Sequence, residues 1–282
     1  MSNAQQIDSE ILSIEPVGAY FHVVLHAPTV AEHVEPGHFA AVSVGGIGSA
    51  MLLRRAFSIH RATPGESIEL IFAAHGQGTQ WLATANVGDV IDIIAPLGKP
   101  FALPNQPVGA VLVAGGYGAA PMGMLAQALR DRGCDVAVVL GAASQDRLFG
   151  VLDLSRDADH FAVTTDDGSS GMRGRVTDAL PDAMRNINAK VVYACGPMGM
   201  LQAVSRVAQK FGAFSQCAVE ESMACGIGIC MTCVLPVIGD DGTTRMVRSC
   251  VDGPVFRGDR VRWDDVHTIP HDAHGAPIVG GH

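Results

Sequence analysis

Four cysteines near the end of the chain constrain its fold more than any other feature of the sequence. They are spaced C-x4-C-x2-C, with sixteen residues before the fourth: Cys225, Cys230, Cys233 and Cys250. The opening is the spacing of plant-type [2Fe–2S] ligands. Each iron needs two thiolates, so one loop has to wrap around a compact inorganic core, and Gly226 and Gly228 allow its backbone a close approach. The spacing therefore predicts a [2Fe–2S] cluster held by these four cysteines.

Other uses of these cysteines explain the spacing less well. Structural zinc sites combine two close pairs of ligands, whereas Cys250 stands alone. A redox-active C-x-x-C pair would use Cys230 and Cys233 and would leave Cys225 without a role. The odd total of seven cysteines also argues against a disulfide framework. The remaining three are scattered and have the character of small buried residues: Cys134, Cys195 and Cys217.

Composition excludes several classes of function. The chain has 282 residues, of which 48% are hydrophobic, so it can bury one large core or two to three small ones. A net charge of −9 and the absence of a basic cluster argue against nucleic acid. No apolar run approaches the roughly 18 residues of a membrane span. The polar start MSNAQQIDSE is unlike a signal peptide, so we expect a cytoplasmic protein.

Apolar patterning divides the chain into three parts. Residues 1–103 contain short β-rich runs and one helix starting near Thr79, which predicts a small antiparallel barrel or sandwich. Residues 104–213 alternate apolar strands with helices, which predicts a parallel sheet with crossover helices. Residues 214–282 carry the cysteine cluster and a Pro-, Gly- and His-rich tail, which favours a surface-draped segment over a metal site.

Two glycine turns have the character of anion sites. Gly115, Gly116 and Gly118 follow an apolar strand and lead into a helix, an arrangement that presents backbone amides to a phosphate. Pro121 occupies the place of the third glycine of G-x-G-x-x-G, and no acidic residue ends the next strand, so the turn alone equally fits a tight connection. The end of the next strand, LGAASQDRLF, has neither a clear acidic residue for a ribose nor a basic pair for a 2′-phosphate, so Arg147 alone does not distinguish NAD from NADP. The second turn, HGQGTQWL, precedes the helix near Thr79.

Taken together, these stretches resemble the ferredoxin-reductase superfamily, and over most of the chain the electron-transfer subunit of class 1B dihydroorotate dehydrogenase. The superfamily's R-x-[YF]-S, G-T, G-G-x-G-x-x-P and C-G-P motifs match Arg55-Ala56-Phe57-Ser58, Gly78-Thr79, Gly115 to Pro121 and Cys195-Gly196-Pro197. The stretches EESMACGIGICMTC and CVDGPVF carry the narrower likeness. The resemblance implies a multidomain α/β plus β chain: an antiparallel FAD-binding β-barrel (1–103), a parallel-sheet NAD-binding domain (104–213) and a small C-terminal [2Fe–2S] domain (214–282).

The resemblance also implies roles for individual residues. The expected FAD-binding residues are Arg55, Ala56, Phe57, Ser58, Phe72, Ala73, Gly78 and Thr79. Many relatives have Tyr at the Phe57 position. The expected NAD-binding residues are Gly115, Gly116, Gly118, Cys195, Gly196 and Pro197. Cys195 would lie near the nicotinamide–flavin junction, although a buried thiol at a strand end fits equally well. No general acid or base is assigned.

The implied function is electron transfer with a partner. In this family an FMN-containing dihydroorotate dehydrogenase catalytic subunit passes electrons through the [2Fe–2S] cluster and FAD to NAD, within a hetero-oligomer (a heterotetramer) of pyrimidine biosynthesis. The apolar residues of the cysteine loop would shield the cluster or dock this partner: Met223, Ile227, Ile229 and Met231. One alternative is the small subunit of a ferredoxin:NADP or sulfide oxidoreductase. Another is a non-catalytic zinc-bearing or redox-sensing binding protein.

Overall fold

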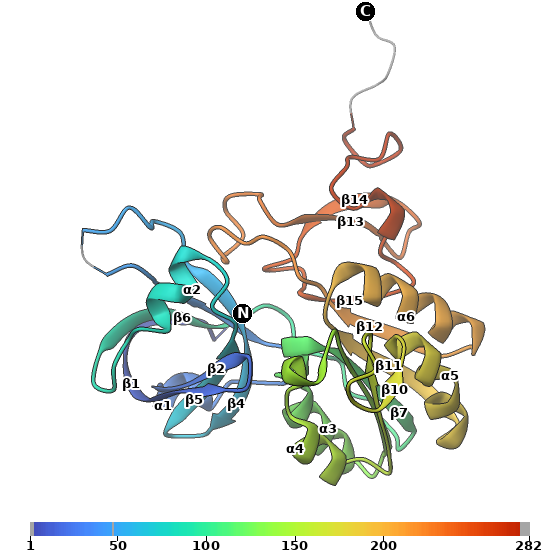
Figure 1. Ribbon diagram of the computed structural model, residues 1–282. Coiled ribbons are helices and arrows are strands. Elements are labelled where there is room, and N and C mark those ends of the chain that lie inside the picture. The colour runs from blue at the N-terminus through green and yellow to red at the C-terminus, as the bar shows by residue number, and fades with distance from the viewer. Residues whose placement is uncertain (1–2, 47, 277–282) are drawn as a thin grey trace, which may run out of the picture.

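The N-terminal part of the chain is a closed antiparallel barrel (Figure 1), in a computed structural model that describes residues 3–46 and 48–276. Its strands follow one another in the order β1-β2-β5-β4-β3-β6. Their bounds are β1 (Gln5–Val17), β2 (Tyr20–His26), β3 (Phe39–Val42), β4 (Arg55–Thr63), β5 (Ser67–Phe72) and β6 (Val90–Leu97), with short helices α1 (Pro28–Ala31) and α2 (Gln77–Leu82) between them. Inward-facing strand residues such as Ile11, Leu25 and Leu70 fill the interior. The predicted barrel and the helix near Thr79 are confirmed.

A seven-stranded, mostly parallel sheet follows, with the strand order β10-β9-β8-β7-β11-β12-β15. Its strands are β7 (Gly109–Gly115), β8 (Asp135–Ala142), β9 (His160–Thr165), β10 (Met172–Arg173), β11 (Ala189–Cys195), β12 (Phe214–Ala218) and β15 (Val255–Arg257). Helices α3 (Met122–Arg130) and α4 (Val151–Arg156) cover the face toward the barrel. The other face is covered by α5 (Val176–Asn186) and α6 (Met198–Lys210). Because both faces are covered, the central strands are almost continuously buried, as the apolar strand runs of the sequence predict.

The C-terminal part leaves this sheet after β12 and returns to it as β15. The excursion carries the four cysteines and the hairpin β13 (Val234–Ile238)–β14 (Thr244–Arg248). The sheet therefore extends beyond the boundary predicted between residues 213 and 214, because β12 pairs in parallel with β11 and β15 pairs antiparallel with β12. The division into three domains stays a prediction. Residues 277–282 of the predicted tail lie outside the described residues.

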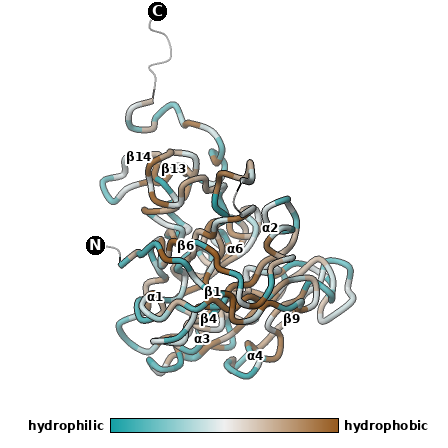
Figure 2. Tube along the Cα trace, turned by 90° about the vertical axis from the view of Figure 1, so that its left-hand side faces the viewer, coloured by the Kyte–Doolittle hydropathy of each residue, from teal (hydrophilic) through white to brown (hydrophobic). Residues whose placement is uncertain are grey.

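Hydropathy follows this architecture. Figure 2 shows apolar stretches running through the strands at the centre of the molecule and polar stretches in the outer turns. Within residues 3–46 and 48–276, no helix is long and apolar enough to span a membrane. Figure 1 shows the β13–β14 hairpin above the sheet and the segment that precedes it reaching across toward the barrel.

Candidate functional site

Two adjoining cavities lie at the seam between the barrel, the sheet and the cysteine excursion. The first, here the barrel cavity, measures about 360 Å³ and is lined on one side by β4, β5 and the start of α2, and on the other by the turns that follow β7, β11 and β12. Every predicted FAD residue lines it except Gly78: Arg55, Ala56, Phe57, Ser58, Phe72, Ala73 and Thr79. The structure thus brings together motifs that lie on different strands of the barrel, while their role in binding FAD stays a prediction.

Arg55 and Gly78 are in direct contact, which explains the glycine. A Cβ atom on residue 78 would lie 2.8 Å from Arg55 Nε and 3.0 Å from Nη2. The Arg55 guanidinium is further oriented by its Nη1, which donates to the Leu53 carbonyl at 2.6 Å. The Thr79 hydroxyl donates to the Gly76 carbonyl at 3.1 Å and fixes the turn. A fixed cation over a bare backbone is a donor set that fits a phosphate group.

Aromatic side chains form the apolar wall of the barrel cavity. The rings of Phe57 and Phe72 are 5.5 Å apart, and Phe21 stacks on Phe72 at the same separation. Such packing fixes flat side chains beside the cavity. The cavity therefore combines a cationic end with an aromatic wall, which fits a flavin that carries a pyrophosphate.

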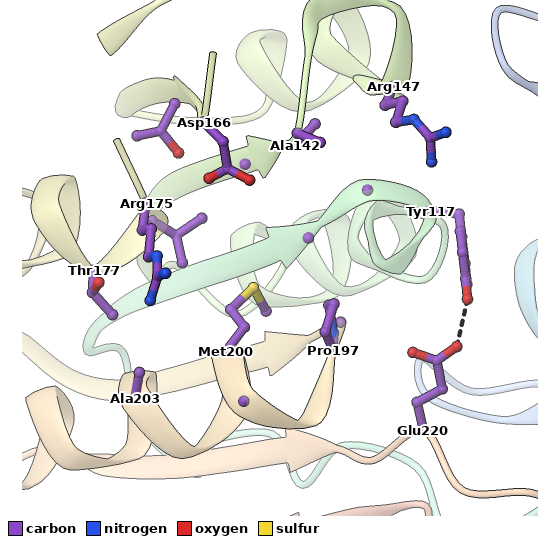
Figure 3. Close-up of a pocket in the computed structure, with 18 of the residues that line it drawn as sticks. Tyr117, Ala142, Arg147, Asp166, Arg175, Thr177, Pro197, Met200, Ala203 and Glu220 are labelled. Carbon is purple, nitrogen blue, oxygen red and sulfur yellow. Dashed lines mark hydrogen bonds between the residues drawn. The ribbon is translucent and has the colours of Figure 1, made fainter. Parts of the chain in front are cut away.

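The second cavity, here the sheet cavity, measures about 540 Å³ and lies at the carboxyl ends of the parallel strands (Figure 3). This edge is where open α/β sheets bind their ligands. The predicted residues Gly115, Gly116, Gly196 and Pro197 line it. Gly118 and Cys195 instead face the barrel cavity, so the six predicted residues surround the junction of the two cavities.

The glycine turn is required by close backbone packing. A Cβ atom on Gly118 would lie 2.7 Å from the Cys195 carbonyl carbon and 2.9 Å from Gly196 N. Gly116 has φ of +56°, a left-handed conformation that favours glycine. The turn after β7 and the turn after β11 are therefore pressed together, which brings both predicted glycine motifs to one place.

Cys195 is a buried thiol at this junction. Burial, and then the charge of Glu220, raise its pKa to about 12, so the thiol is protonated at neutral pH. It lines the barrel cavity, but a protonated thiol cannot accept a proton as a general base.

Several residues of the sheet cavity were missed by sequence reasoning. They are Tyr117, Arg147, Asp166, Arg175 and Glu220, of which Arg147 was considered without a role (Figure 3). The available signal was position: Arg147, Asp166 and Arg175 follow the ends of β8, β9 and β10, which meet at the ligand-binding edge of a parallel sheet. Glu220 gives no such signal, because only the tertiary fold returns it to this edge.

The four cysteines form two neighbouring pairs. Cys233 and Cys250 are buried, and burial followed by the Cys233 thiol raises the pKa of Cys250 to about 12. Cys230 is exposed beside Cys225, and its pKa falls to about 6, first because of the Thr232 hydroxyl and then because of the Thr232 amide and Cys225. Among the described residues, no three His, Cys, Asp or Glu side chains converge on one metal ion. A cluster of two irons needs two thiolates for each iron, and these two pairs of cysteines provide that donor set.

The loop around these thiols has the predicted glycine geometry. Gly226 and Gly228 have φ of +71° and +84°. The Ile229 amide donates to Cys225 Sγ at 3.4 Å, and the Thr232 hydroxyl donates to Cys230 Sγ at 3.1 Å. Donors aimed at sulfur stabilise thiolates, so the loop fits a cluster with thiolate ligands.

The buried cysteine pair packs against the barrel. Cys233 and Cys250 share one apolar cluster with Phe39, Leu97 and Met223. Phe39 and Met223 also line the barrel cavity. The proposed cluster site and the barrel cavity therefore share a wall.

A flavin-type barrel joined to a nucleotide-type sheet defines a ferredoxin-reductase-like oxidoreductase. One solved structure of an NADH-dependent reduced ferredoxin-NADP oxidoreductase has a TM-score of 0.80 and 30% identity, covering 92% of this chain and 91% of that one. The ferredoxin reductase of carbazole 1,9a-dioxygenase, with a TM-score of 0.64, 18% identity and coverage of 74% and 67%, supports the fold alone.

Sequence comparison narrows this class. Residues 220–262 match the family model of the iron-sulfur cluster binding domain of dihydroorotate dehydrogenase B, and residues 112–206 match the oxidoreductase NAD-binding domain. The "dihydroorotate dehydrogenase B (NAD(+)), electron transfer subunit" of Geobacillus thermodenitrificans is 37% identical over 246 residues, covering 86% of this chain and 92% of the relative. The protein of that name from Desulforamulus reducens is 32% identical over 259 residues, covering 91% and 98%.

The chain belongs to the family of electron transfer subunits of dihydroorotate dehydrogenase B. It is an oxidoreductase subunit, as the sequence predicts, and not a non-catalytic binding protein. The predicted cofactors, FAD, a [2Fe–2S] cluster and NAD, are confirmed at the level of this family.

Proposed function

We propose that the chain carries electrons between the FMN of a dihydroorotate dehydrogenase catalytic subunit and NAD, through a [2Fe–2S] cluster and then FAD, in pyrimidine biosynthesis. The wall shared by the cluster site and the barrel cavity carries this proposal, because Phe39 and Met223 touch both. Electron transfer falls steeply with distance, so a route through the chain needs such contact. The order follows from chemistry: FAD exchanges single electrons with a cluster and a hydride with nicotinamide.

The residues of the barrel cavity would bind and orient FAD. Arg55 would pair with a flavin phosphate above Gly78, while Phe57 would pack near the ring and Ser58 would hydrogen-bond to it. The contact between Arg55 and Gly78 and the aromatic wall support these roles. Phe57 lacks the hydroxyl that tyrosine supplies in many relatives, so this position contributes packing alone.

The sheet cavity would hold NAD with its nicotinamide toward the junction. Gly115 and Gly116 would admit the pyrophosphate to the turn, and Arg147 and Arg175 would add positive charge (Figure 3). Asp166 lines the same cavity, and its carboxylate can accept a hydrogen bond from a ribose hydroxyl but repels a 2′-phosphate. This arrangement favours NAD over NADP.

The exposed side of the cysteine loop would dock the catalytic subunit. Ile227, Ile229 and Met231 are 42%, 76% and 52% exposed around Cys230, whereas Met223 packs inward. An apolar rim at the outer end of the electron route fits a partner surface better than it fits solvent. We infer a hetero-oligomer, a heterotetramer by family, and a cytoplasmic location, where the seven free thiols stay reduced. We retain the division into domains at residues 103 and 213 as part of this proposal.

Reconstitution tests the function. The chain is co-purified with a candidate FMN-containing catalytic subunit, and orotate formation is measured with NAD⁺ as acceptor. We expect NADH to form only when both subunits are present. A second candidate, suggested by the 30% identical ferredoxin-NADP oxidoreductase structure, is tested in parallel with reduced ferredoxin and NADP⁺. NAD⁺ reduction by dihydroorotate without this chain, or none with both subunits, would contradict the proposal.

A further inference from the structure

Four residues separate the barrel cavity from the sheet cavity. His75, Tyr117, Gly196 and Glu220 line both cavities. They come from three parts of the chain: the barrel, the sheet and the start of the segment matched to the iron-sulfur binding domain. Hydride transfer needs its two reacting atoms about 3–3.5 Å apart, so nicotinamide and flavin have to touch. The partition must therefore open for the proposed reaction to occur.

The backbone of the partition has little freedom to open it. Gly118 is packed so closely on the Cys195–Gly196 peptide that a Cβ atom on residue 118 would clash with it. A Cβ atom on Gly196 would lie 3.2 Å from both Gly115 N and Gly115 Cα. Since these turns end adjacent central strands, β7 and β11, moving them would disturb the sheet. The opening has to come from a side chain.

The Tyr117 side chain spans the gap and is held at its tip. Its hydroxyl donates to Glu220 Oε1, across the boundary between the sheet and the cysteine excursion (Figure 3). The residue is 38% exposed, and its ring meets that of Tyr20 edge-on, with centroids 6.0 Å apart. Burial, and then the hydrogen bond and charge of Glu220, raise the pKa of Tyr117, so the hydroxyl stays a donor at neutral pH. A hydrogen bond to a carboxylate is stronger than a neutral one and can fix the ring.

We propose that the Tyr117–Glu220 hydrogen bond is a latch that closes the junction, and that the nicotinamide end of NAD opens it by displacing the Tyr117 side chain. Glu220 is exposed, so water replaces the hydroxyl when the latch opens. The latch lowers affinity for NAD, because part of the binding free energy is used to open it. This inference rests on the proposed function.

The test compares two ligands on one variant. Tyr117→Phe keeps the ring and removes the latch, and Tyr193→Phe is a matched control, because its hydroxyl donates to Ala102 O away from both cavities. Dissociation constants for NAD⁺ and ADP-ribose are measured by titration calorimetry on the oxidised, cofactor-loaded chain. ADP-ribose lacks nicotinamide and does not need the junction.

We expect Tyr117→Phe to bind NAD⁺ about ten- to a hundredfold more tightly, as the loss of one hydrogen bond to a carboxylate predicts, and ADP-ribose with unchanged affinity. Tyr193→Phe should resemble the wild type with both ligands. Unchanged or weaker NAD⁺ binding by Tyr117→Phe, or an equal gain with ADP-ribose or in the control, would overturn the latch. Failure of the wild-type chain to bind NAD⁺ at all would instead refute the proposed function.

Discussion

Replacing Gly118 by alanine should slow flavin reduction by NADH far more than it destabilises the protein. The added methyl group would lie 2.7 Å from the Cys195 carbonyl carbon and 2.9 Å from Gly196 N, with the Cys195 oxygen closer still. Ordinary contact begins near 3.4 Å, so the two turns must separate by roughly 0.5–1 Å. Overpacking of this kind costs about 1–3 kcal/mol. For a chain of this size, each kcal/mol lowers Tm by about 2–4 °C.

The catalytic effect follows from where the shift occurs. Cys195 and Gly196 line the junction, and a misplacement of about 1 Å at a reacting centre can reduce rate on the order of 100-fold. The assay is stopped-flow reduction of the bound flavin by NADH, with Tm from thermal unfolding of the same sample. Gly123→Ala is the control, because a Cβ there meets no atom within 4 Å and the residue lies in α3. Its Tm should rise slightly, since alanine favours a helix by about 0.5–1 kcal/mol. Wild-type reduction kinetics in Gly118→Ala would refute the close-packing argument.

Three further expectations concern the cluster and stability. Cys250→Ser should abolish the visible absorption and EPR signal of the cluster while FAD remains bound. The control Cys134→Ser lies outside the site and should retain about two irons per chain. A colourless, zinc-containing wild type would contradict the ligand assignment. Thr232→Val removes the 3.1 Å hydrogen bond to Cys230 Sγ and should lower the reduction potential of the cluster by about 20–60 mV in an EPR redox titration. An unchanged potential would show that this hydrogen bond does not affect the cluster. Burial lowers the pKa of His60, so below about pH 6.5 the unfolded chain binds more protons than the folded chain and the free energy of unfolding should fall. In urea unfolding, His60→Gln should make the free energy of unfolding depend less on pH in this range. A pH dependence equal to that of the wild type would refute this role of His60.

Sequence reasoning succeeded where local pattern determines structure. The alternation of apolar strands and helices predicted the parallel sheet because both of its faces are covered. The spacing of Cys225, Cys230 and Cys233 predicted the iron-sulfur domain that the family model matches over residues 220–262, while the ligand assignment itself stays a prediction. It did not find Tyr117 and Glu220. These residues are distant in sequence and meet only because the chain leaves the sheet after β12 and passes over the junction. The placement of β12 was also missed, since a short strand joined in parallel to β11 has no local signature.

The two cysteine pairs give the proposed electron route a direction. Cys233 and Cys250 are buried against Phe39 and Met223, which reach the barrel cavity. Cys230 is exposed at the opposite side, among the outward-facing residues Ile229 and Met231. The cysteine segment therefore has an inner side packed against the barrel cavity, where FAD is proposed to bind, and an outer side exposed to solvent. Under the proposed function, the apolar residues of MACGIGICMTC divide between shielding and docking by position. Shielding and docking are not alternatives for this loop: an electron can enter from a partner only if one side is open, and can be delivered to the flavin only if the other is packed.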